Sequence, residues 1–244
     1  MINQYKLDST ALGGGNPRAF LSPLSLPALA SPGTARTMPK VGMQPIRCNQ
    51  LIQATLESID QVGLAESSIA HIARAAKLST GIISHYFGDK DGLLEATMRE
   101  LLRNLRDSVS RARREAKATP RAQLRAIIDG NFVPTQVSRS AMRAWLTFWA
   151  ASMHQPRLRR LQRANDRRLY SNLCSQFLRV MPLAQARDAA RGLAALIDGL
   201  WLRGSLQGAD FAGDKARNVA YDYVDLLLDR SQFEGEPALG PPSL

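Results

Sequence analysis

The spacing of apolar residues after Pro45 is the strongest constraint on the fold. Ile52, Leu56 and Ile59 recur at intervals of four and three residues, which is the period of an α-helix. Ala, Leu and Arg are abundant whereas Val and Ile are sparse, so helix formers outnumber strand formers. Four later prolines fall where a helix would begin or end: Pro120, Pro134, Pro156 and Pro182. The sequence therefore predicts an all-α protein.

Capping residues predict where the helices begin and end. A first helix from Pro45 is expected to stop at Gly63, and Ser67 or Ser68 is expected to cap a second, short one. A third helix is expected from Ser79 to Phe87, where Gly88 and Asp89 break it. The same reasoning predicts a long helix from Lys90 to about Lys117 and five more at 120–133, 138–154, 156–180, 183–206 and 214–230.

The second and third predicted helices, joined by Ala76, Lys77 and Leu78, match a helix-turn-helix over 68–87. In that motif the second helix enters the major groove of DNA and presents its N-terminal residues to base edges. The alternative is a capped surface helix with no partner, but the cap, the apolar faces and the restart at Lys90 together favour DNA binding. The candidate DNA-contacting residues are Ser68, Ser79, Thr80, Gly81, Ser84, His85, Tyr86 and Lys90.

The stretch from Ser68 to Leu94 resembles the N-terminal helix-turn-helix of the TetR family of transcriptional repressors. Residues 39–47, 144–156 and 194–203 extend the resemblance to TetR repressors that control the bacterial pathway from choline to glycine betaine. The resemblance implies a repressor of choline uptake and glycine betaine genes that choline or a related effector releases. Two residues depart from the family pattern: Lys77 replaces a usual glycine, and Ser84 replaces a frequent tyrosine. A left-handed Lys77 is expected to cost on the order of 1 kcal/mol.

The resemblance also implies that the C-terminal helices hold an effector pocket and a homodimer seam. Aromatic cages bind quaternary ammonium groups through cation-π attraction, and a buried carboxylate requires a partner. A choline cage is therefore one interpretation, whereas an aromatic core with the carboxylate paired to an arginine is the other. The candidate effector-binding residues are Trp145, Phe148, Trp149, Tyr170, Asp198 and Trp201.

Charge and cysteine content exclude few functions. A net charge of +11 favours a polyanionic partner such as nucleic acid. Cys48 and Cys174 show neither metal-ligand nor disulfide spacing, which favours a reducing cytoplasm. The basic run from Arg103 to Arg125 is interpreted as a solvated helix face rather than a DNA contact. The sequence offers no convincing catalytic motif, metal site or cofactor site, and no apolar run long enough to span a bilayer.

These features predict four segments: a disordered extension (1–37) that could reflect a misassigned start codon, a DNA-binding domain (45–105), an effector and dimerisation domain (106–231), and a disordered tail (232–244). The expected partners are a palindromic double-stranded operator, a small cationic effector such as choline, and a second copy of the chain. Three alternatives remain open: a TetR-type repressor of efflux or lipid metabolism, a helical binding protein that has lost operator binding, and a peripheral membrane protein.

Overall fold

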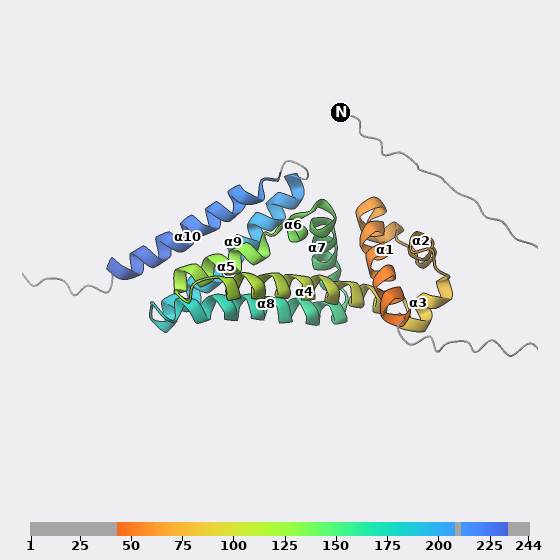
Figure 1. Cartoon of the computed structure of the whole chain (residues 1–244), viewed down its shortest axis with the longest axis horizontal. Coiled ribbons are helices and arrows are strands. Elements are labelled where there is room, and N and C mark those ends of the chain that lie inside the picture. The colour runs from red at the N-terminus through yellow and green to blue at the C-terminus, as the bar shows by residue number, and fades with distance from the viewer. Residues whose placement is uncertain (1–42, 208–210, 234–244) are drawn as a thin grey trace, which may run out of the picture. The chain divides into compact units, whose positions relative to one another are not determined.

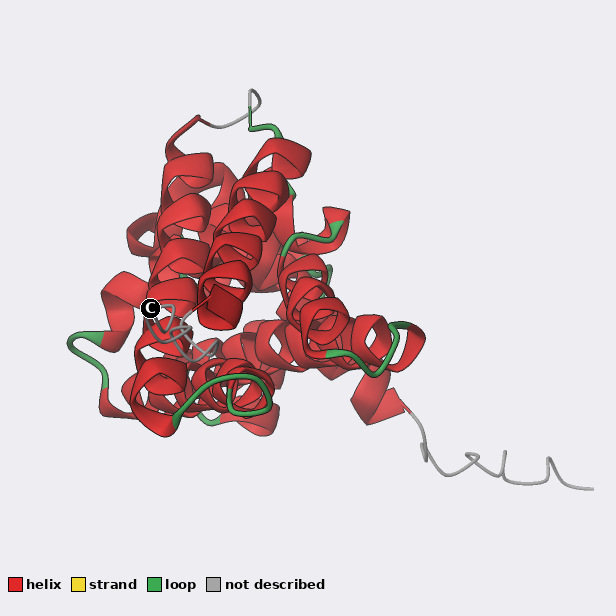
Figure 2. Cartoon of the chain, turned by 90° about the vertical axis from the view of Figure 1, so that its left-hand side faces the viewer, coloured by secondary structure: helices red, strands yellow, loops and turns green. Residues whose placement is uncertain are grey.

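The structure is a computed structural model that describes residues 43–207 and 211–233, and every regular element in these ranges is a helix (Figures 1 and 2). The all-α prediction is therefore confirmed. The predicted extension at 1–37 lies outside the described residues, as does the predicted tail beyond Phe233.

The first four helices are α1 (Met43–Glu66), α2 (Ile69–Ala75), α3 (Thr80–Phe87) and α4 (Lys90–Glu115). They are followed by α5 (Pro120–Asn131), α6 (Pro134–Val137), α7 (Arg139–Ser152), α8 (Pro156–Phe177), α9 (Leu183–Gln207) and α10 (Gly213–Phe233). The predicted ends agree with these bounds to within about three residues. The short helix α6 was not predicted, because four residues carry no detectable apolar period.

Helix α1 differs from the prediction at its end. Gly63 leaves the helical conformation with φ of 76° and ψ of 171°, as a glycine at a helix terminus does, but the helix resumes and reaches Glu66. The hydroxyl of Ser67 donates to the Gly63 carbonyl at 2.6 Å and accepts from the Ser58 hydroxyl at 2.8 Å. Ser67 therefore closes this kink, and the neighbouring Ser68 caps the next helix.

Side-chain caps fix the starts of four helices. The side chains of Ser68, Asp89, Thr119 and Ser138 each accept a hydrogen bond from the backbone N–H three residues further on. The shortest of these bonds joins Asp89 to Gly92 at 2.6 Å, and it opens α4 directly after the left-handed Gly88, whose φ is 81°. Each such cap stabilises its helix by about 1 kcal/mol. Local sequence therefore sets these helix starts.

Two separate groups of buried apolar residues hold the helices together. The head cluster packs α1, α2, α3 and the start of α4 around Leu51, Ala54, Ile72, Ala73, Ile83 and Leu93. The larger body cluster packs α4, α5 and α7–α10, with one buried residue, Ile59, from α1, and includes Met98, Leu124, Phe148, Phe177 and Leu193. Helix α4 contributes to both, since Leu93 belongs to the head cluster and Leu94 to the body cluster.

Ion pairs attach α10 and α1 to the rest of the helices. Arg121 and Arg125 on α5 both lie 2.5 Å from carboxylate oxygens of Asp225 on α10. On the other side, Arg143 of α7 donates to the backbone oxygen of Asp60 on α1 at 2.5 Å, and Arg139 lies 3.4 Å from the Asp60 carboxylate. Arginines at the end of the basic run therefore pair with carboxylates of the same chain. None of the described helices combines the length and apolarity that a bilayer crossing requires.

Candidate DNA-binding helix and ligand pocket

The turn between α2 and α3 has the geometry of a helix end followed by a left-handed residue. Lys77 has φ of 53°, its N–H donates to the Arg74 carbonyl at 3.0 Å, and the Leu78 N–H donates to the Ala73 carbonyl at 2.9 Å. This pair of bonds is the Schellman motif. The left-handed conformation expected at Lys77 is confirmed, and Leu78 packs against the head cluster.

Helix α3 buries one face and exposes the other. Ile83 is fully buried and Ile82 and Phe87 are half-buried, whereas Thr80, Gly81, Ser84 and His85 are exposed. A β-carbon placed on Gly81 would meet no heavy atom within 4 Å, so this surface is open. The outward face of α3 thus offers hydroxyl and imidazole groups at its N-terminal end, where a major-groove helix meets base edges.

The remaining candidate DNA contacts lie in α3 or at the start of α2, α3 or α4, and three of them have contacts within the chain. Ser68 caps α2 through the N–H of His71, and Ser79 precedes α3 without a side-chain cap bond. The ring of Tyr86 lies 4.9 Å from that of His85, centroid to centroid. The Lys90 ammonium donates to the Leu64 carbonyl at 3.3 Å, which leaves two of its protons for another acceptor. Their role at DNA stays a prediction.

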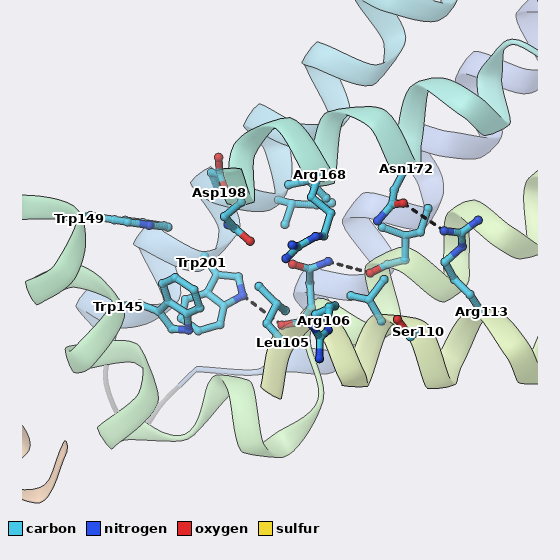
Figure 3. Close-up of a pocket in the computed structure, with 16 residues that line it drawn as sticks. Leu105, Arg106, Ser110, Arg113, Trp145, Trp149, Arg168, Asn172, Asp198 and Trp201 are labelled. Atoms are coloured by element: carbon cyan, nitrogen blue, oxygen red, sulfur yellow. Dashed lines mark hydrogen bonds between the residues drawn. The ribbon is translucent and has the colours of Figure 1, made fainter. Parts of the chain in front are cut away.

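A cavity of about 320 Å³ lies among α4, α5, α7, α8 and α9 (Figure 3). The three tryptophans of the chain, Trp145, Trp149 and Trp201, all line it. The Trp145 ring meets Trp201 edge to face at 6.1 Å between centroids and Trp149 at 6.5 Å with a 50° tilt. These rings form an aromatic wall from two helices, α7 and α9.

Hydrogen bonds orient two of the three indoles. Trp145 Nε1 donates to Gln136 Oε1 at 3.4 Å, and Trp201 Nε1 donates to the Asn131 carbonyl at 3.2 Å. Trp149 Nε1 is buried and has no hydrogen-bond partner among the described residues. The unpredicted helix α6 therefore has a role at the pocket, because Gln136 belongs to it.

Asp198 also lines the cavity, and the arginine partner expected for its carboxylate is not found among the described residues. Asp198 is an exposed residue, and within the described residues no arginine or lysine lies in ion-pair distance of it. Loss of hydration, with the negative charge of Asp166 as the smaller cause, raises the pKa of the Asp198 carboxyl to about 6. A cation in the cavity would favour the ionised carboxylate.

Two residues predicted to contact an effector lie elsewhere. Phe148 is fully buried in the body cluster and is absent from the cavity lining, because its position on α7 points it into the core. Tyr170 is half-buried on α8, and the Arg191 guanidinium lies 5.9 Å from its ring centroid. Both residues pack against the body cluster and neither lines the cavity, so contact of either with an effector stays an untested prediction.

Three arginines that sequence reasoning did not assign to the pocket line it: Arg106, Arg113 and Arg168. Helical spacing could have found them, because Arg106, Ser110 and Arg113 share one face of α4. Asn165, Arg168 and Asn172 likewise share one face of α8. Both helices carry many other arginines, so the sequence alone did not distinguish the pocket-lining arginines from the solvated ones.

The described residues form neither a metal-ligand cluster nor a disulfide at the helix-turn-helix or the pocket. In the ranges that the structure covers, no three His, Cys, Asp or Glu side chains gather as a metal site would require. Cys48 is half-buried and Cys174 is buried, and both are free thiols.

An exposed helix-turn-helix face on one hydrophobic cluster and a ligand-sized cavity in a second one together define a one-component regulator. Comparison with known proteins agrees. Residues 51–97 match the bacterial regulatory proteins of the tetR family, and residues 120–229 match the C-terminal part of BetI-type transcriptional repressors.

Curated relatives match along most of the chain. A transcriptional regulator BetI from Ectopseudomonas mendocina is 65% identical over 196 residues, which cover 80% of this chain and 100% of the relative. A second BetI regulator, from Stenotrophomonas maltophilia, is 61% identical over a stretch that covers 78% of this chain and 97% of the relative. The chain therefore belongs to the TetR family, among its BetI-type transcriptional repressors.

Solved structures agree on the fold. A TetR regulator from Haloarcula marismortui has a TM-score of 0.67 at 23% identity, covering 75% of this chain and 99% of that one. A regulator from Saccharomonospora viridis, solved in complex with choline, has a TM-score of 0.63 at 22% identity. The match covers 74% of this chain and 96% of that one.

Proposed function

We propose that this repressor controls genes of choline uptake and glycine betaine synthesis, and that choline or a close relative releases it from its operator. The observation that carries the proposal is a cavity that joins three tryptophans to a carboxylate, Asp198, for which the described residues supply no ion-pair partner. Cation-π attraction contributes about 0.5–2 kcal/mol per ring, and Asp198 supplies the opposite charge. The choline complex of the Saccharomonospora regulator indicates that this fold can hold the ligand.

The proposed DNA contacts are the exposed groups of α3 together with the surrounding candidates. Thr80 and His85 would read base edges, and Tyr86 and Lys90 would meet the sugar-phosphate chain. Ser84 lies on the same exposed face. We infer a cytoplasmic protein, since its target is the chromosome.

A homodimer would place two α3 helices on a palindromic operator. Apolar side chains exposed on α9 and α10 suit a seam between two copies: Leu202, Leu206, Val219 and Leu226. Leu206 is 77% exposed and Leu226 66%, so both are accessible to a second copy of the chain. Leu193, also on α9, is fully buried within the chain and belongs to its own core.

Helix α7 offers a route from the pocket to the head cluster. It carries Trp145 and Trp149 at the cavity, and on another face it carries Arg143, which bonds to Asp60 of α1. An effector that binds the tryptophans would shift α7, and α1 would follow through this contact. Release of DNA requires that the effector bind the non-DNA arrangement more tightly than the DNA-bound one.

Calorimetric titration of choline, betaine aldehyde and glycine betaine into the purified protein tests the effector. Choline is expected to bind, and Trp149→Ala is expected to weaken it at least tenfold. The absence of heat with all three compounds would contradict the choline proposal and favour a TetR repressor of another pathway.

Binding to a palindromic duplex and to a scrambled duplex, each at several salt concentrations, tests the DNA site. A specific repressor should prefer the palindrome by a factor of at least about 10³. Equal affinities would leave only sequence-independent attraction to phosphates. That result would favour a protein with this fold that no longer reads an operator.

A further inference from the structure

The cavity carries more positive charge than a site for a bare cation needs. Three arginines line it against the one carboxylate of Asp198. A lone quaternary ammonium would enter among guanidinium groups that repel it. The arginines at the cavity therefore require an explanation of their own.

Arg113 is held in place by neutral groups. Its Nε donates to Gln123 Oε1 at 3.1 Å, and its Nη1 donates to Asn172 Oδ1 at 3.1 Å. These amides orient the half-buried guanidinium and leave its charge uncompensated. A guanidinium fixed in this way can still donate from Nη2 to an incoming anion.

Arg168 lies at the cavity without a fixed partner. Among the described residues, no carboxylate lies within ion-pair distance of Arg168 or Arg113. Arg106 differs, because it pairs with the adjacent Asp107 at 2.9 Å. The two arginines that remain are therefore free to bind an anionic group of a ligand.

Asp198 and Arg113 lie on opposite sides of the cavity. Figure 3 shows the tryptophans and Asp198 on one side, Arg113 and Asn172 on the other, and Arg168 between them. The pKa of Asp198 agrees with this separation: lost hydration and Asp166 raise it, and no arginine counteracts them. One cavity thus presents a cation-binding end and an anion-binding end.

We propose that Arg113 and Arg168 form an anion subsite, and that the pocket accepts zwitterions in which a quaternary ammonium is joined to a phosphate or a carboxylate. The ammonium end of this site rests on the proposed function, whereas the anion end rests on the arginines alone. The cavity of about 320 Å³ lies in the range of small-ligand pockets, and choline occupies only part of it. Phosphocholine and glycine betaine extend toward the arginines with three phosphate oxygens or one carboxylate.

Calorimetry with choline, phosphocholine and glycine betaine tests the subsite. The wild-type protein is expected to bind phosphocholine at least as tightly as choline, with glycine betaine weaker than phosphocholine because its carboxylate offers fewer acceptors. Arg168→Gln should weaken both zwitterions at least tenfold and leave choline unchanged or slightly tighter. Arg113→Gln is expected to have the same selective effect.

Arg167→Gln is the matched control, because it removes the same charge from the neighbouring position on α8, outside the cavity lining. It should change no affinity more than twofold, and far-UV circular dichroism should show all variants folded. Equal losses for choline and phosphocholine in Arg168→Gln would overturn the anion subsite. Choline binding without any zwitterion binding would do the same and leave the proposed function intact, whereas failure of all three ligands would overturn both.

Discussion

The helix-turn-helix and the ligand pocket differ in how they are assembled. The turn, caps and exposed face of α3 come from one continuous stretch, Ser68–Lys90. The pocket draws on five helices, and its lining residues run from Leu105 to Trp201. Changes in the first region should therefore act locally, and changes in the second should separate into those that alter packing and those that alter ligand binding.

The largest expected effect is loss of packing beneath the pocket. Phe148→Ala should lower the free energy of unfolding by about 3–5 kcal/mol, because it removes a fully buried ring from the body cluster. Urea denaturation measures this change. Trp149 is half-buried on the same helix. Trp149→Ala should therefore lower the free energy of unfolding less than Phe148→Ala does, and it should weaken choline binding more. The reverse ranking would contradict the assignment of Phe148 to the core and Trp149 to the pocket.

A smaller effect is expected from the exposed face of α3. Replacing Thr80 and His85 together by alanine should reduce discrimination between operator and scrambled DNA by about 2–4 kcal/mol, at about 1–3 kcal/mol per base contact. Fluorescence anisotropy with both duplexes measures it. The melting temperature should stay the same, because both side chains are exposed. Undiminished discrimination in a folded variant would show that α3 does not read the bases.

Asp198→Asn should weaken choline binding by about tenfold at pH 7.5, or about 1.4 kcal/mol. In the wild type, choline affinity should rise as the pH increases from about 5 to 7, because Asp198, whose pKa is about 6, becomes ionised. Burial also raises the pKa of Asp166, whose negative charge acts on Asp198. Calorimetry at several pH values should give a flatter profile for the variant.

The same variant should stabilise the ligand-free protein. Because the pKa of Asp198 is higher in the folded chain than in the unfolded one, its stabilising contribution is complete below about pH 4 and is lost as the pH rises through 6. Asp198→Asn should therefore raise the free energy of unfolding at pH 7.5 by about 1 kcal/mol, a figure reduced for solvent access through the cavity. A loss of stability would indicate that the carboxylate has a stabilising partner.

The smallest predicted change lies in the turn of the helix-turn-helix. Lys77→Gly should raise the stability of the protein by about 1 kcal/mol, since glycine adopts the left-handed conformation without strain. Thermal denaturation of the two proteins measures the difference. Lys77→Ala is the control and should give no comparable gain, because alanine keeps the β-carbon that causes the strain.

The sequence predicted the helix-turn-helix region more completely than the pocket, because the first depends on neighbouring residues and the second on how distant helices pack. Caps such as Ser68 and the left-handed Lys77 depend on neighbours in the chain, so their patterns are visible in sequence. The cavity depends on which faces of α4 and α8 turn inward, and Arg113 and Arg168 look like their solvated neighbours until those helices are packed. Phe148 shows the converse, because an aromatic residue at pocket spacing lies in the core.

In the proposed mechanism, a cation bound at the tryptophans lowers the affinity of α3 for operator DNA. This claim is tested most directly by measuring operator affinity with and without saturating choline, for the wild type and for Trp149→Ala. Choline should weaken the wild-type complex by about 5–150-fold, the usual range of allosteric coupling, and should not affect the variant. An operator affinity that choline leaves unchanged in the wild type, although calorimetry shows choline bound, would contradict the claim.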